Sequence, residues 1–288
     1  MNEYIKQLKE QNKLNICIDK TKDFSFKVWD KEIGNGNFTI MAGPCSIEGP
    51  EFIEFAKILK NEKVDIIRGG AYKPCTYPIL NEVGENGWKE GLKEEGLTIL
   101  QQASFEAQIP TITEAMSPDD VEKIANDTDI IQVGTRNFQN YALLDELGKH
   151  DIPVLLKRGT WGTIDEILGA VERIMVGGNE KVAICLRGTI GQPSYRHVFN
   201  SIRWAPDLMM IPALKELTNV PIIFDPSHST GYSNFVVPMS KAAMAAGADG
   251  IIVEVHPDPE NSISDAAQAI NVKQLREITY FANSMFLI

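Results

Sequence analysis

The chain has 288 residues, of which 43% are hydrophobic, and a formal net charge of −11 at pH 7. This acidic balance argues against a general affinity for nucleic acids or anionic membranes, and no apolar run reaches the roughly 18 residues of a transmembrane helix. The polar first residues do not have the pattern of a secretory leader. We therefore expect a cytoplasmic protein whose four widely spaced cysteines are thiols.

Residues 1–36 are polar and mixed, and they predict a short N-terminal extension. From Phe38 onward, apolar runs rich in β-branched residues alternate with stretches of helical periodicity. The expected strands are 38–42, 64–68, 110–114, 129–133, 153–157, 181–186, 220–225 and 250–255. The expected helices are about 50–60, 94–107, 117–126, 139–148, 163–177, 206–218, 236–247 and 265–283.

This alternation of strands and helices, without a linker-like break, favours the α/β class and a single (β/α)8 TIM barrel over residues 37–288. The competing fold is an open doubly wound sheet. That fold usually has a glycine-rich phosphate loop after its first strand, and the sequence contains no GxGxxG or GxxxxGK[ST] motif.

Chemically competent side chains lie at or just past the end of every predicted strand. In a barrel, the carboxyl ends of the strands converge, so these residues can meet although they are distant in sequence. In chain order they are Cys45, Arg68 with Lys73, Glu114, Arg136, Lys157, Arg187, His228, and Glu254 with Asp265.

These residues divide into two groups by their chemistry. The Arg and Lys side chains, focused into the mouth of an acidic protein, predict a small polyanionic ligand with phosphate and carboxylate groups. The other group offers a thiolate, an imidazole and two carboxylates, a ligand set that suits a borderline divalent cation acting as a Lewis acid. Its members are Cys45, His228, Glu254 and Asp265.

Several motifs resemble those of 3-deoxy-7-phosphoheptulonate (DAHP) synthases. The resemblance is closest to the short bacterial branch related to 3-deoxy-octulosonate 8-phosphate (KDO8P) synthase, and it runs from about residue 38 to residue 275. The motifs are MAGPCSIE, RGGAYKP, GTRN (134–137), LLKRG (155–159), CLRG (185–188), DPSHSTG (225–231) and EVHPDPENSISD (254–265).

The resemblance implies a metal-dependent aldol-type condensation of phosphoenolpyruvate (PEP) with erythrose 4-phosphate. This reaction gives DAHP and phosphate and begins the shikimate pathway to the aromatic amino acids. The resemblance also implies one divalent ion (Mn, Fe, Co or Zn), small phosphorylated substrates, and a homodimer or homotetramer.

Site residues carry over from the same motifs. The resemblance implies PEP binding by Arg68, Lys73, Glu114, Arg136, Lys157 and Arg187, and acceptor binding by Lys73, Pro74, Thr76 and Asp225. It implies the same four metal ligands that the strand ends select, with Lys73, Cys45 and His228 as catalytic residues. Lys73 would donate a proton or act only electrostatically.

The sequence departs from the family where the acceptor should bind. Cys75 stands where the family has an Arg, a loss of about 1.5–3 kcal/mol for a hydrogen bond to a charged group, and Tyr77 replaces a Ser. Leu186 replaces a Glu, and the loop 188–204 is unusual. Either a cation of that loop (Arg196, His197 or Arg203) compensates, or the acceptor is a different aldose or aldose phosphate.

Two other classes of function stay open. A Schiff-base aldolase would use Lys157 as a covalent nucleophile and need no metal. A non-catalytic homologue would bind PEP without releasing phosphate. His256 lies on the same face of an extended run as Glu254, and it is either a partner for a metal ligand or a structural residue.

Overall fold

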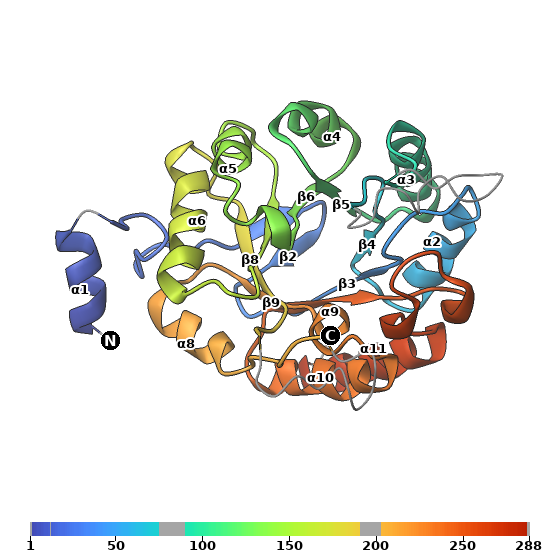
Figure 1. Cartoon of the computed structure of the whole chain (residues 1–288). Coiled ribbons are helices and arrows are strands. Elements are labelled where there is room, and N and C mark those ends of the chain that lie inside the picture. The colour runs from blue at the N-terminus through green and yellow to red at the C-terminus, as the bar shows by residue number, and fades with distance from the viewer. Residues whose placement is uncertain (1, 12, 75–89, 191–202, 287–288) are drawn as a thin grey trace.

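The computed structural model describes residues 2–11, 13–74, 90–190 and 203–286. Its centre is a closed barrel of eight parallel strands in the order β10-β3-β4-β5-β6-β7-β8-β9, which confirms the predicted TIM barrel (Figure 1). The strands are β3 (Thr39–Gly43), β4 (Ile66–Arg68), β5 (Thr111–Ala115), β6 (Ile130–Val133), β7 (Val154–Lys157), β8 (Val182–Leu186), β9 (Ile222–Phe224) and β10 (Gly250–Glu254).

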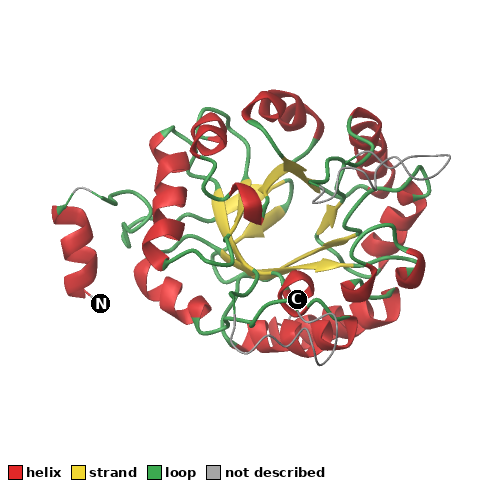
Figure 2. Cartoon of the chain, viewed as in Figure 1, coloured by secondary structure: helices red, strands yellow, loops and turns green. Residues whose placement is uncertain are grey.

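Helices form a ring outside the strands (Figure 2). The main ones are α2 (Phe52–Asn61), α3 (Glu94–Ala107), α4 (Val121–Asp127), α5 (Tyr141–Leu147), α6 (Ile164–Val176), α8 (Met210–Leu217), α10 (Ser233–Ala245) and α11 (Val272–Phe286). The last predicted helix was wrong at its start, because residues before Val272 form loops and short 3-10 turns. No helix among the described residues is long and apolar enough to cross a membrane.

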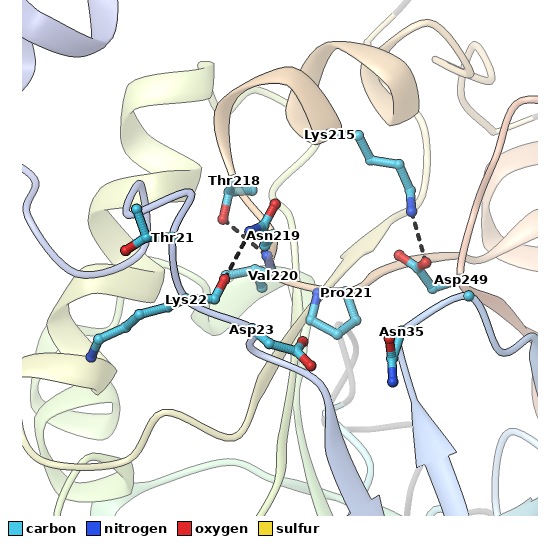
Figure 3. A pocket seen from close by; sticks show the side chains of 12 residues that line it. Thr21, Lys22, Asp23, Asn35, Lys215, Thr218, Asn219, Val220, Pro221 and Asp249 are labelled. Atoms are coloured by element: carbon cyan, nitrogen blue, oxygen red, sulfur yellow. Dashed lines mark hydrogen bonds and ion pairs between the residues drawn. The ribbon is translucent and has the colours of Figure 1, made fainter.

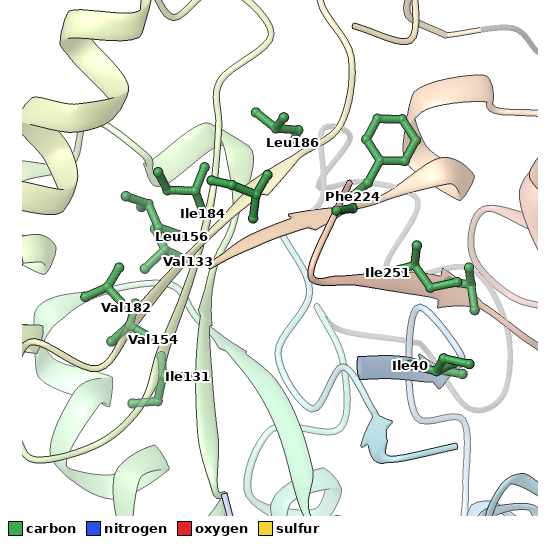
Figure 4. Packing of buried hydrophobic residues seen from close by; sticks show 14 of the residues in the cluster. Ile40, Ile131, Val133, Val154, Leu156, Val182, Ile184, Leu186, Phe224 and Ile251 are labelled. Carbon is green, nitrogen blue, oxygen red and sulfur yellow. The ribbon is translucent and has the colours of Figure 1, made fainter. Parts of the chain in front are cut away.

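The two faces of the strands have different partners. Successive side chains point to opposite faces of a strand, so every second residue faces the barrel axis. The outward-facing residues, such as Val154 and Ile184, pack beneath the helices (Figure 4). The inward-facing residues form a separate buried cluster that fills the barrel: Met41, Ile66, Ile112, Ile130, Leu155, Ala183, Cys185, Ile223 and Ile252.

The segment before the barrel closes its amino-terminal end. It contains a helix, α1 (Asn2–Glu10), which lies outside the ring (Figure 1), and an antiparallel hairpin, β1 (Phe26–Val28) with β2 (Lys31–Ile33). Phe26, Val28 and Ile33 belong to the cluster that fills the barrel. The predicted division into an extension (1–36) and a barrel (37–288) stays a prediction, but the hairpin shares the core of the barrel.

A buried carboxylate anchors this segment to α6. Glu172 is only 8% exposed, and its oxygens accept hydrogen bonds from the backbone N–H groups of Asn15 (2.7 Å), Ile16 (2.9 Å) and Cys17 (2.8 Å). Burial and the neighbouring Glu172 raise the pKa of the Cys17 thiol. Thr218, just after α8, donates to the carbonyl of Cys17 at 2.5 Å. The segment therefore lies across α6 and α8.

A polar pocket lies where this segment meets the turns that precede β9 and β10 (Figure 3). Its lining groups bind one another: Lys215 Nζ lies 2.7 Å from Asp249 Oδ1, and Asn219 donates to the carbonyls of Lys20 and Lys22. The two bonds of Asn219 connect the N-terminal segment to the end of the barrel opposite the functional strand ends.

Replacing Glu172 with Ala should lower the free energy of unfolding by about 2 kcal/mol or more, because three backbone N–H groups lose their acceptor. Urea denaturation measures the change. Glu180→Ala is the control: Glu180 also binds the segment, through Lys22 at 2.7 Å, but both side chains are more than 40% exposed. That substitution should cost less than about 1 kcal/mol, and equal losses in the two variants would contradict the anchoring role of Glu172.

Candidate active site

Four potential metal ligands meet at the carboxyl ends of the strands. One ligand atom from each of Cys45, His228, Glu254 and Asp265 lies within 4.8 Å of all the others. Cys45 Sγ is 3.2 Å from Asp265 Oδ2, and His228 Nε2 is 3.2 Å from Glu254 Oε1. The donor set and its compactness fit a single divalent ion.

The pleat of the strands places polar side chains directly above the apolar filling of the barrel. Two residues beyond Ile66, Leu155 and Ile252 on the same inward face come Arg68, Lys157 and Glu254. These three residues are at most 5% exposed. A buried charge requires a partner, and each of the three has one: Arg68 donates to Glu254 Oε1 at 2.9 Å, and Lys157 donates to Asp225 Oδ2 at 2.5 Å.

The motif DPSHSTG forms a single helical turn, α9 (Pro226–Thr230), that fixes the histidine. Asp225 is its N-cap and accepts the backbone N–H of His228 at 2.9 Å, Pro226 is its first residue, and Gly231 ends it in a left-handed conformation (φ 64°). The other oxygen of Asp225 lies 2.8 Å from His228 Nδ1 in a close polar contact. This arrangement turns Nε2 toward Glu254 and Asp265.

Cys45 reaches the site because two backbones approach closely. A Cβ atom on Gly70 would lie 2.2 Å from the carbonyl oxygen of Cys45, so only glycine allows the loop after β4 to pass the loop after β3. Burial, together with Glu254, raises the pKa of the Cys45 thiol to about 12. Burial lowers the pKa of His228 to about 4 and keeps the imidazole neutral, the form that binds metal.

Lys73 lies at the edge of the ligand set. Its Nζ contacts Cys45 Sγ and lies 3.3 Å from Asp265 Oδ2. Burial favours the neutral amine, but Cys45 and Asp265 outweigh it and raise the pKa of Lys73. The ammonium group therefore balances part of the negative charge that the ligands bring together.

Further cations beside these ligands form a candidate anion site. Arg187 donates to Thr135 Oγ1 at 3.2 Å, but its buried Nε has no hydrogen-bond partner among the described residues. Burial lowers the pKa of this guanidinium. Arg136, on the 3-10 turn Thr135–Asn137, is exposed. A buried guanidinium nitrogen without a partner among the described residues makes Arg187 a candidate anion ligand.

Glu114 occupies the inner face of β5, where Gln132 donates to its Oε2 at 2.8 Å. A Cβ atom on Gly134 would lie 1.9 Å from Glu114 Oε1. Gly134 is therefore required for the position of Glu114.

The structure brings most of the predicted site residues to this end of the barrel. Asp225 is completely buried between Lys157 and His228, and Pro74 is half-buried. Arg203 donates to Asp265 Oδ1 at 2.5 Å, which makes it the cation of the 188–204 loop with a defined position. Predictions for Cys75, Thr76, Tyr77, Arg196 and His197 lie outside the described residues.

Three partners of the site were missed at the sequence level. Gln268 donates to Glu254 Oε2 at 2.5 Å, and Ser227 Oγ accepts the backbone N–H of Glu254 at 2.9 Å. No sequence pattern marks either contact. Gln132 could have been found, because it follows Ile130 by two residues and therefore lies on the inward face of the same strand.

Fold and site together define a class: a (β/α)8 barrel enzyme whose strand ends gather candidate metal ligands and a cluster of cations. Residues 6–286 match the model of the DAHP synthetase I family. The chain belongs to that family.

Individual relatives agree with this assignment. The chain is 42% identical over 258 residues to phospho-2-dehydro-3-deoxyheptonate aldolase of Thermotoga maritima, with 89% of this chain and 72% of the relative covered. It is 27% identical over 272 residues to 2-dehydro-3-deoxyphosphooctonate aldolase of Koribacter versatilis, with 88% and 92% covered.

Solved structures show the same similarity. The crystal structure of the Thermotoga maritima DAHP synthase superposes with a TM-score of 0.86 at 39% identity, over 94% of this chain and 76% of that one. A truncated form of the same organism's synthase gives a TM-score of 0.80 at 39% identity, over 92% and 93% of the two chains.

Gly134→Ala should weaken the binding of PEP by about tenfold, since the new methyl group displaces Glu114 from the anion site. Gly169→Ala is the matched control, because a Cβ atom there meets nothing within 4 Å and α6 gains helix propensity. Calorimetric titration with PEP gives both dissociation constants. An unchanged constant for Gly134→Ala would contradict the predicted role of Glu114.

Proposed function

We propose that the protein is a DAHP synthase that condenses PEP with erythrose 4-phosphate in a metal-dependent reaction. The observation that carries the proposal is the convergence of Cys45, His228, Glu254 and Asp265 within 4.8 Å, beside the buried cations. Metal ligands next to an anion site suit a reaction that joins a phosphorylated enol to an aldehyde.

We assign PEP to the deeper cations. The buried Nε of Arg187 has no partner in the part of the chain that the structure describes, and Lys157 lies nearby on the inner face of β7, held by Asp225. Together with Arg136 they would bind the phosphate and carboxylate, while Arg68, Lys73 and Glu114 line the same site. Fixed cations would hold the enol in one orientation. Such orientation of one reactant supplies a large part of the rate enhancement in a bimolecular reaction.

The chemistry follows from this placement. A divalent ion held by the four ligands would supply Lewis-acid polarisation of the acceptor aldehyde. C3 of PEP then forms a bond to the aldehyde carbon, and Lys73 would give a proton to the resulting alkoxide or stabilise it only electrostatically. Water adds at C2 of PEP, and the hemiketal phosphate loses phosphate as its C–O bond breaks.

Two alternatives remain for binding of the acceptor phosphate, because Cys75 stands at the position of the usual cation. Arg203 supports the first alternative, compensation by the 188–204 loop. One of its nitrogens holds Asp265 Oδ1, while its side chain is 41% exposed and has further donors for an anion. The second alternative is a different aldose or aldose phosphate.

We further propose a cytoplasmic homodimer or homotetramer that uses Mn, Fe, Co or Zn. The mixed thiolate, imidazole and carboxylate set accepts any of these ions, so the donors alone do not choose between them.

The test is release of phosphate from PEP by protein reconstituted with each metal. The acceptors are erythrose 4-phosphate, arabinose 5-phosphate, ribose 5-phosphate and unphosphorylated erythrose, each with and without a chelator. We expect turnover with erythrose 4-phosphate that the chelator abolishes. Metal-dependent turnover with another acceptor alone would support the second alternative, and binding of PEP without turnover would indicate a non-catalytic homologue.

The Schiff-base alternative makes the opposite prediction. Borohydride reduction in the presence of a carbonyl substrate would attach the substrate to Lys157, and a chelator would have no effect. We expect no covalent adduct by mass spectrometry, since Lys157 Nζ is engaged by Asp225 at 2.5 Å in a buried ion pair. An adduct on Lys157 would overturn the metal-dependent mechanism.

A further inference from the structure

The loop from Glu254 to Asp265 carries a candidate metal ligand at each end. The backbone at the second end is unusual, because Asp265 has φ 56°. This value lies in the left-handed region, which residues other than glycine uncommonly adopt. Such a conformation persists only where surrounding contacts hold it. The contacts that hold this loop therefore bear on the geometry of the metal centre proposed above.

Glu48 provides several of these contacts with one side chain. Its Oε1 accepts the backbone N–H of Ile263 at 2.8 Å and the hydroxyl of Ser262 at 3.4 Å, and it lies 3.4 Å from His256 Nε2. The side chains of Glu48 and His256 are 19% and 11% exposed, so water competes little for these bonds. Neither residue lies in a strand or a helix.

Glu48 and its partners lie close in sequence to three of the candidate metal ligands. Glu48 follows the ligand Cys45 by three residues, and Ile47 between them is fully buried with its N–H bound to the carbonyl of Gly70. On the other side, His256 follows the ligand Glu254 by two residues, and Ile263 precedes Asp265 by two. One carboxylate thus joins the segments that carry three of the four ligands.

A separate contact sets the carboxylate of Asp265 rather than its backbone. Arg203 holds Oδ1, which leaves Oδ2 facing Cys45 and His228. The two anchors are therefore distinct: Arg203 orients the ligand atom, and Glu48 fixes the loop that brings it there.

We infer that Glu48 is a positioning residue of the metal centre: through Ile263 and His256 it holds the loop that carries Asp265 against the loop that carries Cys45. This inference rests on the proposed metal-dependent function. Loss of Glu48 should weaken metal binding while leaving the anion site intact, since Arg187 and Lys157 have other partners.

The experiment compares Glu48→Ala, Glu48→Gln and the control Glu51→Ala, an exposed acid on the same loop without a side-chain cap bond. Metal-free protein is titrated with Co²⁺ against a chelating dye, and the thiolate-to-cobalt absorption band reports the ligand set. Amide hydrogen exchange of residues 256–265 is measured without metal. PEP affinity and the thermal midpoint are recorded for each variant.

We expect Glu48→Ala to raise the dissociation constant for Co²⁺ by about 10- to 100-fold, the usual effect of losing a partner that supports metal ligands. Exchange at Ile263 should accelerate, and the affinity for PEP should stay within twofold of the wild-type value. Glu48→Gln keeps an acceptor for the N–H of Ile263 and should show a smaller loss. Glu51→Ala should match the wild type.

A Co²⁺ affinity within twofold of the wild-type value in Glu48→Ala, with unchanged exchange at Ile263, would overturn the inference. Equal losses of Co²⁺ and PEP affinity would also overturn it, because they would indicate general disruption of the site. Wild-type protein that binds no Co²⁺ would instead overturn the proposed metal centre, and the exchange of metal-free protein would still test whether Glu48 holds the loop.

Discussion

The buried ion pairs at the top of the barrel are the constraint on which the rest of the site depends. Removing a charge from water costs several kcal/mol, so each buried charge needs a close partner of opposite sign. Asp225 meets this need for Lys157 at 2.5 Å, and its other oxygen caps the turn that carries His228. On the opposite side of His228, Arg68 and Glu254 form a second buried ion pair at 2.9 Å. The imidazole therefore lies between two fixed carboxylates and cannot rotate freely.

Both the core and the site follow from the alternation of side chains along the strands. The inward face carries apolar residues at one level and charged residues two positions later. The register of each strand therefore determines both the packing of the core and the position of the charged side chains. A shift of one residue in β7 would turn Lys157 into the helix layer and bring Leu156 into the anion site. The precision of the catalytic geometry is thus tied to the stability of the sheet, and loops contribute the adjustable parts: Cys45, Lys73, Arg203 and Asp265.

Much of this arrangement could be predicted from the sequence, because strand periodicity and strand-end chemistry are local signals. The expected helix 94–107 has the bounds of α3, and the four proposed metal ligands converge as expected. The β1–β2 hairpin was not expected: its strands are three residues long, and Trp29 in the turn adopts φ 55° without the Asn-Gly or Asp-Gly signal of such turns. The contacts of Glu48 and Gln268 depend on loop conformations that no periodicity encodes.

The hairpin that fills the amino-terminal end of the barrel also has a consequence for the order of folding. Phe26, Val28 and Ile33 are synthesised early, but the apolar cluster that receives them includes Ile223 and Ile252, from the last two strands of the chain. Their binding site is therefore complete only after β10 has paired with β3 and closed the sheet. More than two hundred further residues must be synthesised on the ribosome before these three side chains can pack into the barrel. Their packing therefore follows closure of the barrel and is a late step in its folding.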